Sequence, residues 1–110
     1  MLVEAVEEFE NVSVSVFSGL LVEYAEKIQA SVIVRGIRAV SDYESELQMA
    51  LMNRRLSSRV ETIFMMPAGR YSFLSSGLVK EISLLGGSIN GLVPAKVETR
   101  LVDKCSRKRE

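Results

Sequence analysis

A pair of arginines follows a short run of β-branched residues in this sequence. The run, Val32–Val34, predicts a buried strand, and Arg35-Gly36-Ile37-Arg38 comes directly after it. Ser41 and Glu44 then have the S-x-x-E spacing of a capping box, which predicts the start of a helix. Arginine binds phosphate oxygens bidentately, and a helix N-terminus favours negative charge. The stretch therefore predicts a phosphate-binding site, the alternative being two ordinary surface arginines in a loop.

Three polar side chains share one stripe of the helix that follows. They are Asp42, Glu46 and Asn53, at spacings of four and seven residues. A solvated helix face is the simpler interpretation of this stripe. Beside two arginines, the alternative is that Glu46 and Asn53 accept hydrogen bonds from a ribose or base and orient the guanidinium groups. Asp42 is also explained by its favourable interaction with the helix dipole.

A serine-rich stretch is the second candidate for phosphate binding. It consists of Tyr71, Ser72, Phe73, Leu74, Ser75, Ser76 and Gly77. Ser75 or Ser76 is expected to cap a helix that Gly86-Gly87 ends. An ordinary serine-capped helix is one interpretation. The functional interpretation is a helix start rich in hydroxyl and amide groups that cradles phosphate.

Composition excludes several classes of function. The sequence has no histidine, so a Ser-His-Asp triad is excluded and the commonest zinc ligand is missing. The single cysteine, Cys105, cannot form an internal disulfide, which predicts a reducing, cytoplasmic location. Fourteen basic and fourteen acidic residues argue against a nucleic-acid or anionic-membrane partner. No apolar run is long enough to cross a bilayer.

Alternating helix and strand patterns must position these residues. Such alternation implies a parallel sheet with right-handed crossovers, and one α/β domain over residues 1–110 is expected. Ligands of such sheets bind at the carboxyl ends of the strands, where the arginines and the serine-rich stretch are both expected. The predicted elements are the later part of a helix over Met1–Glu10, strands over Val12–Phe17, Ser31–Val34 and Glu61–Met66, and helices over 20–29, 42–56, 76–85 and from Pro94 onward. The buried face of the 42–56 helix is expected to include Tyr43, Leu47, Ala50 and Leu51.

Several of these stretches together resemble bacterial phosphopantetheine adenylyltransferase. The RGxR…DxExE…NR pattern of residues 35–54 is specific to that family, and the resemblance covers nearly the whole chain. It is carried by VRGIRAVSDYESELQMA at 34–50, MNR at 52–54, the Glu61–Pro67 strand, FLSSGLVKE at 73–81 and the Gly91–Pro94 turn.

The resemblance implies an enzyme of coenzyme A biosynthesis. Such an enzyme transfers the adenylyl group of ATP to 4′-phosphopantetheine and releases pyrophosphate. The implied fold is an α/β, Rossmann-like nucleotidyltransferase with a parallel sheet flanked by helices. The implied cofactor is Mg²⁺, which accompanies ATP, and the implied assembly is a homohexamer.

The same resemblance assigns binding residues. Arg35 is expected to contact phosphopantetheine, and Leu21 to line the pantetheine pocket. ATP is expected to contact Gly36, Ile37, Arg38 and Glu46, together with the loop of Tyr71, Ser72, Phe73, Leu74, Ser75, Ser76 and Gly77. Gly77 stands where the family commonly has a third serine, so one hydroxyl is lost while the backbone amide stays.

The family's front motifs do not occur in these 110 residues. The family begins with a strand, a Gly-(Thr/Ser)-Phe-Asp-Pro turn and a (Thr/His)-x-Gly-His motif whose histidine stabilises the transferring phosphate. We therefore expect an N-terminally truncated domain without that catalytic residue, weak ATP binding and little turnover. One alternative is a remnant that only binds nucleotide or forms oligomers. Another is a different nucleotidyltransferase, against which the pattern of Arg35 to Asn53 argues.

Overall fold

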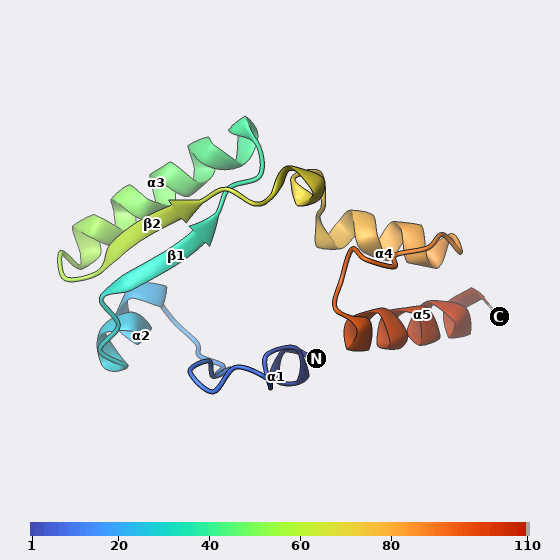
Figure 1. Cartoon of the computed structure of the whole chain (residues 1–110). Coiled ribbons are helices and arrows are strands. Elements are labelled where there is room, and N and C mark those ends of the chain that lie inside the picture. The colour runs from blue at the N-terminus through green and yellow to red at the C-terminus, as the bar shows by residue number, and fades with distance from the viewer. Residues whose placement is uncertain (110) are drawn as a thin grey trace. The chain divides into compact units, whose positions relative to one another are not determined.

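Helices and strands alternate along most of the chain in a computed structural model, which describes residues 1–109 without the side chains of residues 40, 41 and 109 (Figure 1). The chain divides into two compact units, residues 16–73 in one and residues 1–15 with those from 74 onward in the other. The elements are α1 (Leu2–Ala5), α2 (Leu21–Lys27), β1 (Val32–Gly36), α3 (Val40–Leu56), β2 (Glu61–Met65), a 3-10 turn (Gly69–Tyr71), α4 (Ser76–Leu84) and α5 (Ala95–Arg109).

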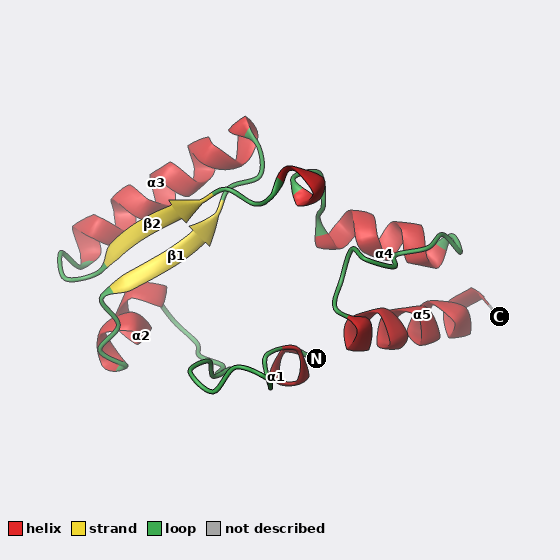
Figure 2. Cartoon of the chain, in the orientation of Figure 1, coloured by secondary structure: helices red, strands yellow, loops and turns green. Residues whose placement is uncertain are grey.

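The unit of residues 16–73 is built on two parallel strands. β1 pairs with β2 in a register that runs from Val32 opposite Glu61 to Gly36 opposite Met65. The Ile37 N–H donates to the Met65 carbonyl at 3.0 Å, which extends the ladder by one residue. Parallel strands need a crossover, and α3 supplies it, lying beside β2 (Figure 2). This arrangement confirms the predicted α/β class and the parallel pairing.

The buried residues of this unit tie α2 to the end of α3. Val22 and Ala25 of α2 are buried, as is Val60 just before β2. The hydroxyl of Ser57, the residue that ends α3, donates a hydrogen bond to the Glu26 carboxylate of α2. The hydroxyl of the buried Ser57 is therefore satisfied by a neighbouring helix rather than left unpaired.

In the second unit, α4 packs against α5. Val79 on α4, Cys105 on α5 and Ile89 between the two helices are buried. Ser75 is the N-cap of α4, and Gly86 follows the helix with a φ of 86°. Both boundaries agree with the sequence prediction, because a capping hydroxyl and a left-handed glycine are local signals.

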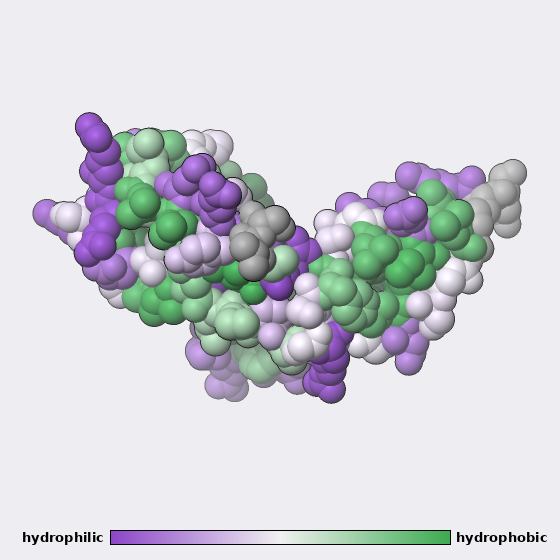
Figure 3. Space-filling view, turned by 90° about the horizontal axis from the view of Figure 1, so that it is seen from above, coloured by the Kyte–Doolittle hydropathy of each residue, from purple (hydrophilic) through white to green (hydrophobic). Residues whose placement is uncertain are grey.

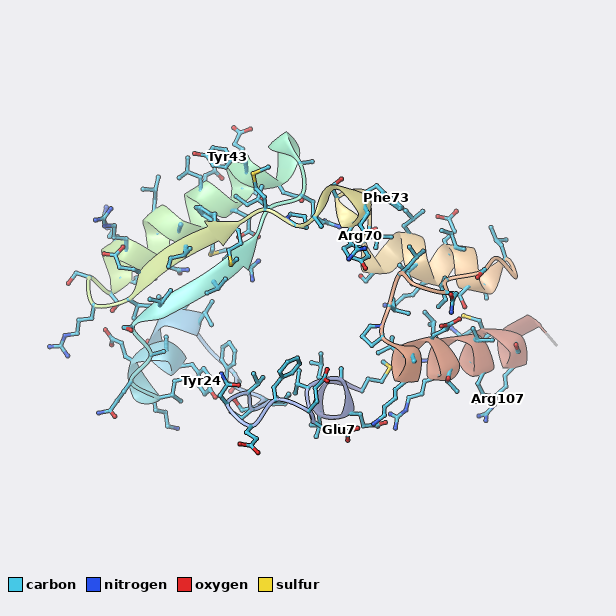
Figure 4. All side chains as sticks on the ribbon, in the orientation of Figure 1. Glu7, Tyr24, Tyr43, Arg70, Phe73 and Arg107 are labelled. Carbon is cyan, nitrogen blue, oxygen red and sulfur yellow. The ribbon has the colours of Figure 1, made fainter. Side chains whose placement is uncertain are left out.

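Charged side chains of α5 hold the start of the chain within this second unit. Glu7, labelled in Figure 4, pairs with Lys96, and Glu4 of α1 pairs with Arg100. The predicted helix over Met1–Glu10 is wrong about its extent, since only Leu2–Ala5 is helical. A four-residue helix has almost no internal hydrogen bonds, so it depends on contacts outside itself, among them those with α5.

The strand predicted over Val12–Phe17 is wrong. These six residues, all described by the structure, form no strand, and their side chains are exposed. The alternation of valine and serine satisfies only the side-chain period of a strand. A strand also needs a neighbouring backbone to pair with and a surface that buries one of its faces.

The predicted start and buried face of α3 also need correction. The helix begins at Val40 with Ala39 as N-cap, so the capping box predicted at Ser41 is wrong about the boundary; the side chain of Ser41 lies outside the described residues. Tyr43, seen on α3 in Figure 4, is 48% exposed and Leu51 is 58% exposed, whereas Asn53 is buried. The interior side of α3 therefore includes Asn53, and Tyr43 still contacts β2, where its ring meets that of Phe64 edge-on with centroids 6.3 Å apart.

Large apolar side chains lie on the surface of both units, as the green areas of Figure 3 show. The predicted burial of the Val32–Val34 strand is therefore wrong: Val32 is 41% exposed and Val34 60% exposed, as is Met65 on the paired strand. Within the described residues, no helix combines the length and the apolar character needed to span a bilayer.

Candidate functional site

Arg35 lies at the carboxyl end of β1, where its guanidinium group meets a carboxylate from α3. Its Nε donates to Glu46 Oε2 at 2.9 Å, and its Nη2 donates to Glu46 Oε1 at 2.6 Å. A bidentate pair of this kind fixes the plane of the guanidinium group as well as its position. Glu46 thus orients Arg35, one of the roles proposed for it from the sequence.

This contact changes the proton affinity of both groups. The hydrogen bond from Arg35 lowers the pKa of the Glu46 carboxyl, against the smaller opposing effect of desolvation. The same hydrogen bond raises the pKa of the Arg35 guanidinium. Both side chains therefore stay charged throughout the neutral range, and the site keeps a fixed arrangement of charge.

Arg38 lies in the short segment between β1 and α3 and has a carboxylate contact of its own. Both its backbone N–H and its Nε donate to Asp42 Oδ2, at 3.3 and 3.2 Å. Asp42 is in the first turn of α3, where a negative charge is favourable. From the sequence, Asp42 was explained by the helix dipole, and this contact was not predicted. The spacing of four residues is no clear signal, because it indicates neighbours only within one helix and Arg38 precedes α3.

These four side chains, Arg35, Arg38, Asp42 and Glu46, form what we call the arginine site. Asp42 and Glu46 are one helical turn apart on α3, and each contacts one arginine. The arginine site joins the carboxyl end of a parallel strand to the start of the following helix, the usual place for ligands in open α/β sheets. Guanidinium groups that carboxylates already hold in position at such a place are suited to binding phosphate oxygens.

The other predicted residues of this unit surround the strand end and the start of α2. Gly36 is the last residue of β1, and no atom lies within 4 Å of the place that a Cβ would take, so the backbone there is open to close approach. Ile37 continues the pairing with Met65. Leu21 is half-buried at the first position of α2, next to the buried Val22.

The predicted serine-rich loop begins in this unit with Tyr71, Ser72 and Phe73. Arg70, labelled in Figure 4, makes a cation–π contact with the neighbouring Tyr71, its guanidinium carbon 4.8 Å from the centre of that ring. The Ser72 hydroxyl donates to the Gly69 carbonyl at 2.8 Å and closes the 3-10 turn. Phe73 is exposed. Internal contacts therefore shape this part of the loop before any ligand binds.

The rest of that loop, Leu74 to Gly77, belongs to the second unit and forms the N-terminus of α4. The Ser75 hydroxyl accepts from the Leu78 N–H at 3.1 Å, which settles that Ser75 is the cap, while Ser76 is the first helical residue. A Cβ at Gly77 would meet only Ser75 Oγ, at 3.9 Å, so a serine side chain would fit there. The backbone N–H groups of this turn are the feature that suits an anion.

The described residues contain no cluster of three or more His, Cys, Asp or Glu side chains able to hold a metal ion. Magnesium often binds proteins through one or two carboxylates and the phosphates of a bound nucleotide. The residues present therefore fit Mg²⁺ only as a companion of a phosphorylated ligand.

Comparison with known proteins identifies the family. Residues 1–82 match the cytidylyltransferase-like family. Phosphopantetheine adenylyltransferase of Alkaliphilus oremlandii is 50% identical over 104 residues, which are 94% of this chain and 66% of that protein. The enzyme of the same name from Desulfatibacillum aliphaticivorans is 52% identical over 94% of this chain and 59% of its own length. That from Natranaerobius thermophilus is 44% identical over the whole chain and 68% of its own length.

The chain thus spans less than two thirds of the length of the first two relatives. The high identity over nearly all of this chain, the match over residues 1–82 and the parallel α/β unit agree with one another. The chain belongs to the phosphopantetheine adenylyltransferase family, within the cytidylyltransferase-like nucleotidyltransferases.

Proposed function

We propose that this chain carries substrate-binding machinery for the transfer of an adenylyl group from ATP to 4′-phosphopantetheine. The observation that carries the proposal is the arginine site. Two guanidinium groups at the end of β1 are each held by a carboxylate of α3, in a chain about half identical to enzymes of that name. The products would be dephospho-coenzyme A and pyrophosphate, which places the chain in coenzyme A biosynthesis.

The chemistry of this transfer suits fixed cations. An oxygen of the 4′-phosphate attacks the α-phosphorus of ATP, the bond from that phosphorus to the bridging oxygen breaks, and pyrophosphate leaves. The rate of such a reaction depends on the alignment of the reacting oxygens and on neutralisation of charge at the phosphate in flight. Because Glu46 and Asp42 already hold the two arginines, little reorganisation is needed when phosphate groups arrive.

The proposed roles follow the family resemblance. Arg35 contacts the 4′-phosphate of phosphopantetheine, and Leu21 lines the pocket for the pantetheine chain. The ATP contacts are Gly36, Ile37, Arg38 and Glu46, with the Tyr71–Gly77 loop as a further ATP-binding element. Mg²⁺ comes with the phosphates of ATP. A homohexamer and a cytoplasmic location complete the proposal.

Calorimetric titration of the 110-residue chain tests this function. We expect ATP with Mg²⁺ and 4′-phosphopantetheine to bind, and nicotinate mononucleotide, an acceptor for a different nucleotidyltransferase, not to bind. Binding is the primary measurement because the chain spans only part of its relatives' length. A preference for nicotinate mononucleotide, or no binding of ATP, would contradict the proposal.

Two single variants sharpen the assignment. Arg38→Ala is expected to weaken ATP binding about tenfold or more, because hydrogen bonds to charged groups contribute about 1.5–3 kcal/mol. Arg35→Ala is expected to weaken 4′-phosphopantetheine more than ATP. The matched control is Arg107→Ala, which breaks another Arg–Asp pair of i,i+4 spacing, on α5 (Figure 4), and is expected to change neither affinity.

A further inference from the structure

We propose that Asp42 is a positioning residue for nucleotide binding, acting through Arg38. The inference rests on the proposed function, since it concerns the residue that aims a proposed ATP-binding arginine. Asp42 is not among the residues for which the sequence analysis predicted a substrate contact. Its role is visible only in the geometry of its carboxylate.

Asp42 holds Arg38 at two points. One carboxylate oxygen, Oδ2, accepts from the backbone N–H of Arg38 at 3.3 Å and from its Nε at 3.2 Å. The first bond fixes the main chain between β1 and α3, and the second fixes the base of the guanidinium group. A side chain and its own backbone held by one acceptor lose much of their rotational freedom, so Arg38 meets a ligand already oriented.

The contact between Arg38 and Asp42 is less exposed than the Arg–Asp pair of the same spacing on α5. The side chains of Arg38 and Asp42 are 42% and 31% exposed, against 77% and 62% for Arg107 and Asp103. Both pairs have i,i+4 spacing, but the pair near the strand end is less exposed and therefore less screened by solvent. Glu46, one turn further along α3, holds Arg35 through two guanidinium nitrogens, so two successive carboxylates of α3 contact the two arginines.

Two possible roles of Asp42 predict opposite results. If its carboxylate only neutralised Arg38, its removal would strengthen attraction for the phosphates and tighten ATP binding. If the carboxylate aims Arg38, its removal would weaken binding, although the site becomes more positive. Asp42→Ala removes both the charge and the acceptor, whereas Asp42→Asn removes the charge and keeps an acceptor oxygen.

The test is titration of ATP with Mg²⁺ into the chain and its variants. We expect Asp42→Ala to weaken binding about tenfold, the loss typical of an interaction with a charged group, and Asp42→Asn to fall between that variant and the parent chain. Asp103→Ala, the matched control on α5, is expected to bind as the parent chain does. In an Arg38→Ala background, Asp42→Ala is expected to cause a smaller loss than in the parent chain, because the guanidinium group is gone and only the bond to the backbone N–H of residue 38 is left to lose.

NMR spectroscopy detects the contact between Asp42 and Arg38 in the absence of ATP. In ¹H–¹⁵N NMR spectra, Asp42→Ala is expected to shift the Arg38 backbone amide and its Nε–H together, and to leave the Nε–H of Arg35 in place. An unchanged Arg38 Nε–H signal would overturn the inference, even if the variant bound ATP poorly because it was unstable.

The two proposals fail in different ways. If ATP binds the parent chain without needing Arg38, the proposed function of this arginine fails. If binding needs Arg38 but is unchanged or tighter in Asp42→Ala, the positioning role alone fails and the proposed function stands.

Discussion

The N-cap of α4 offers a test that separates a structural serine from a proposed ligand-binding one. Ser75 has extended backbone angles, φ −141° and ψ 160°, and its hydroxyl accepts from the Leu78 N–H at 3.1 Å. This bond satisfies one of the four N–H groups that a helix start leaves unpaired. Ser76 follows as the first helical residue, so the two adjacent serines differ in role although they are identical in type.

The expected magnitudes differ accordingly. Replacing a serine N-cap by alanine costs about 1 kcal/mol. For a domain of this size, such a loss lowers the melting temperature by about 4–8 °C. Ser76→Ala is expected to be neutral or slightly stabilising, because alanine is the better helix former by a few tenths of a kcal/mol. The predicted difference between the two variants is therefore about 1 kcal/mol.

Thermal and urea unfolding, followed by circular dichroism, measure this difference. A third variant, Ser75→Asp, keeps the capping acceptor and adds a favourable charge at the helix start, so its stability is expected to match the parent chain. The same carboxylate should repel phosphate, so ATP is expected to bind Ser75→Asp more weakly. Equal losses of stability in Ser75→Ala and Ser76→Ala would refute the assignment of the cap.

Three further predictions follow from local geometry. The buried Oγ of Ser83 has no hydrogen-bond partner among the described residues, so Ser83→Ala is expected to leave the melting temperature unchanged or raise it; a clear decrease would contradict this. A Cβ at Gly87 would lie 2.7 Å from Ile82 Cγ2 and 3.3 Å from the Ile82 carbonyl oxygen. Gly87→Ala is therefore expected to cost about 1–3 kcal/mol in urea unfolding, whereas Gly69→Ala, with open space around it, should not. The lowered pKa of Glu46 means that its contribution to stability is complete above the ordinary carboxyl range near pH 4.5 and is lost as the pH falls through the lower folded-state value. Melting curves of Glu46→Gln and the parent chain should thus differ at pH 7 and converge as the pH falls below the folded-state pKa of Glu46.

The amino-acid sequence alone determined the elements whose signals are local. The β-branched run before Arg35 forms β1, the hydroxyl of Ser75 caps α4, and Gly86 follows its end with positive φ. Each of these signals acts within a few residues, through rotamer preference, a capping hydrogen bond or left-handed backbone. The order of strand, helix and strand also implied a parallel pair, because no short connection can join parallel strands.

Tertiary contacts decided what local signals left open. The alternating residues Val12–Phe17 form no strand, because pairing depends on a distant backbone that the period does not specify. On α3, Asn53 is buried, whereas Tyr43 contacts Phe64 of β2 edge-on and yet stays 48% exposed. Neither outcome is encoded in the spacing of apolar residues.

The arginine site shows the same division. Residue types and spacing predicted that Arg35 and Arg38 follow a strand end and favoured them as phosphate ligands, with Glu46 as an orienting group. Only the folded structure shows that Glu46 pairs with Arg35, eleven residues earlier in the chain. It also shows that Asp42 accepts hydrogen bonds from both the backbone and the side chain of Arg38. The physical reason is that a hydrogen bond depends on distances of a few tenths of an ångström and on direction, and packing of α3 beside the sheet sets both.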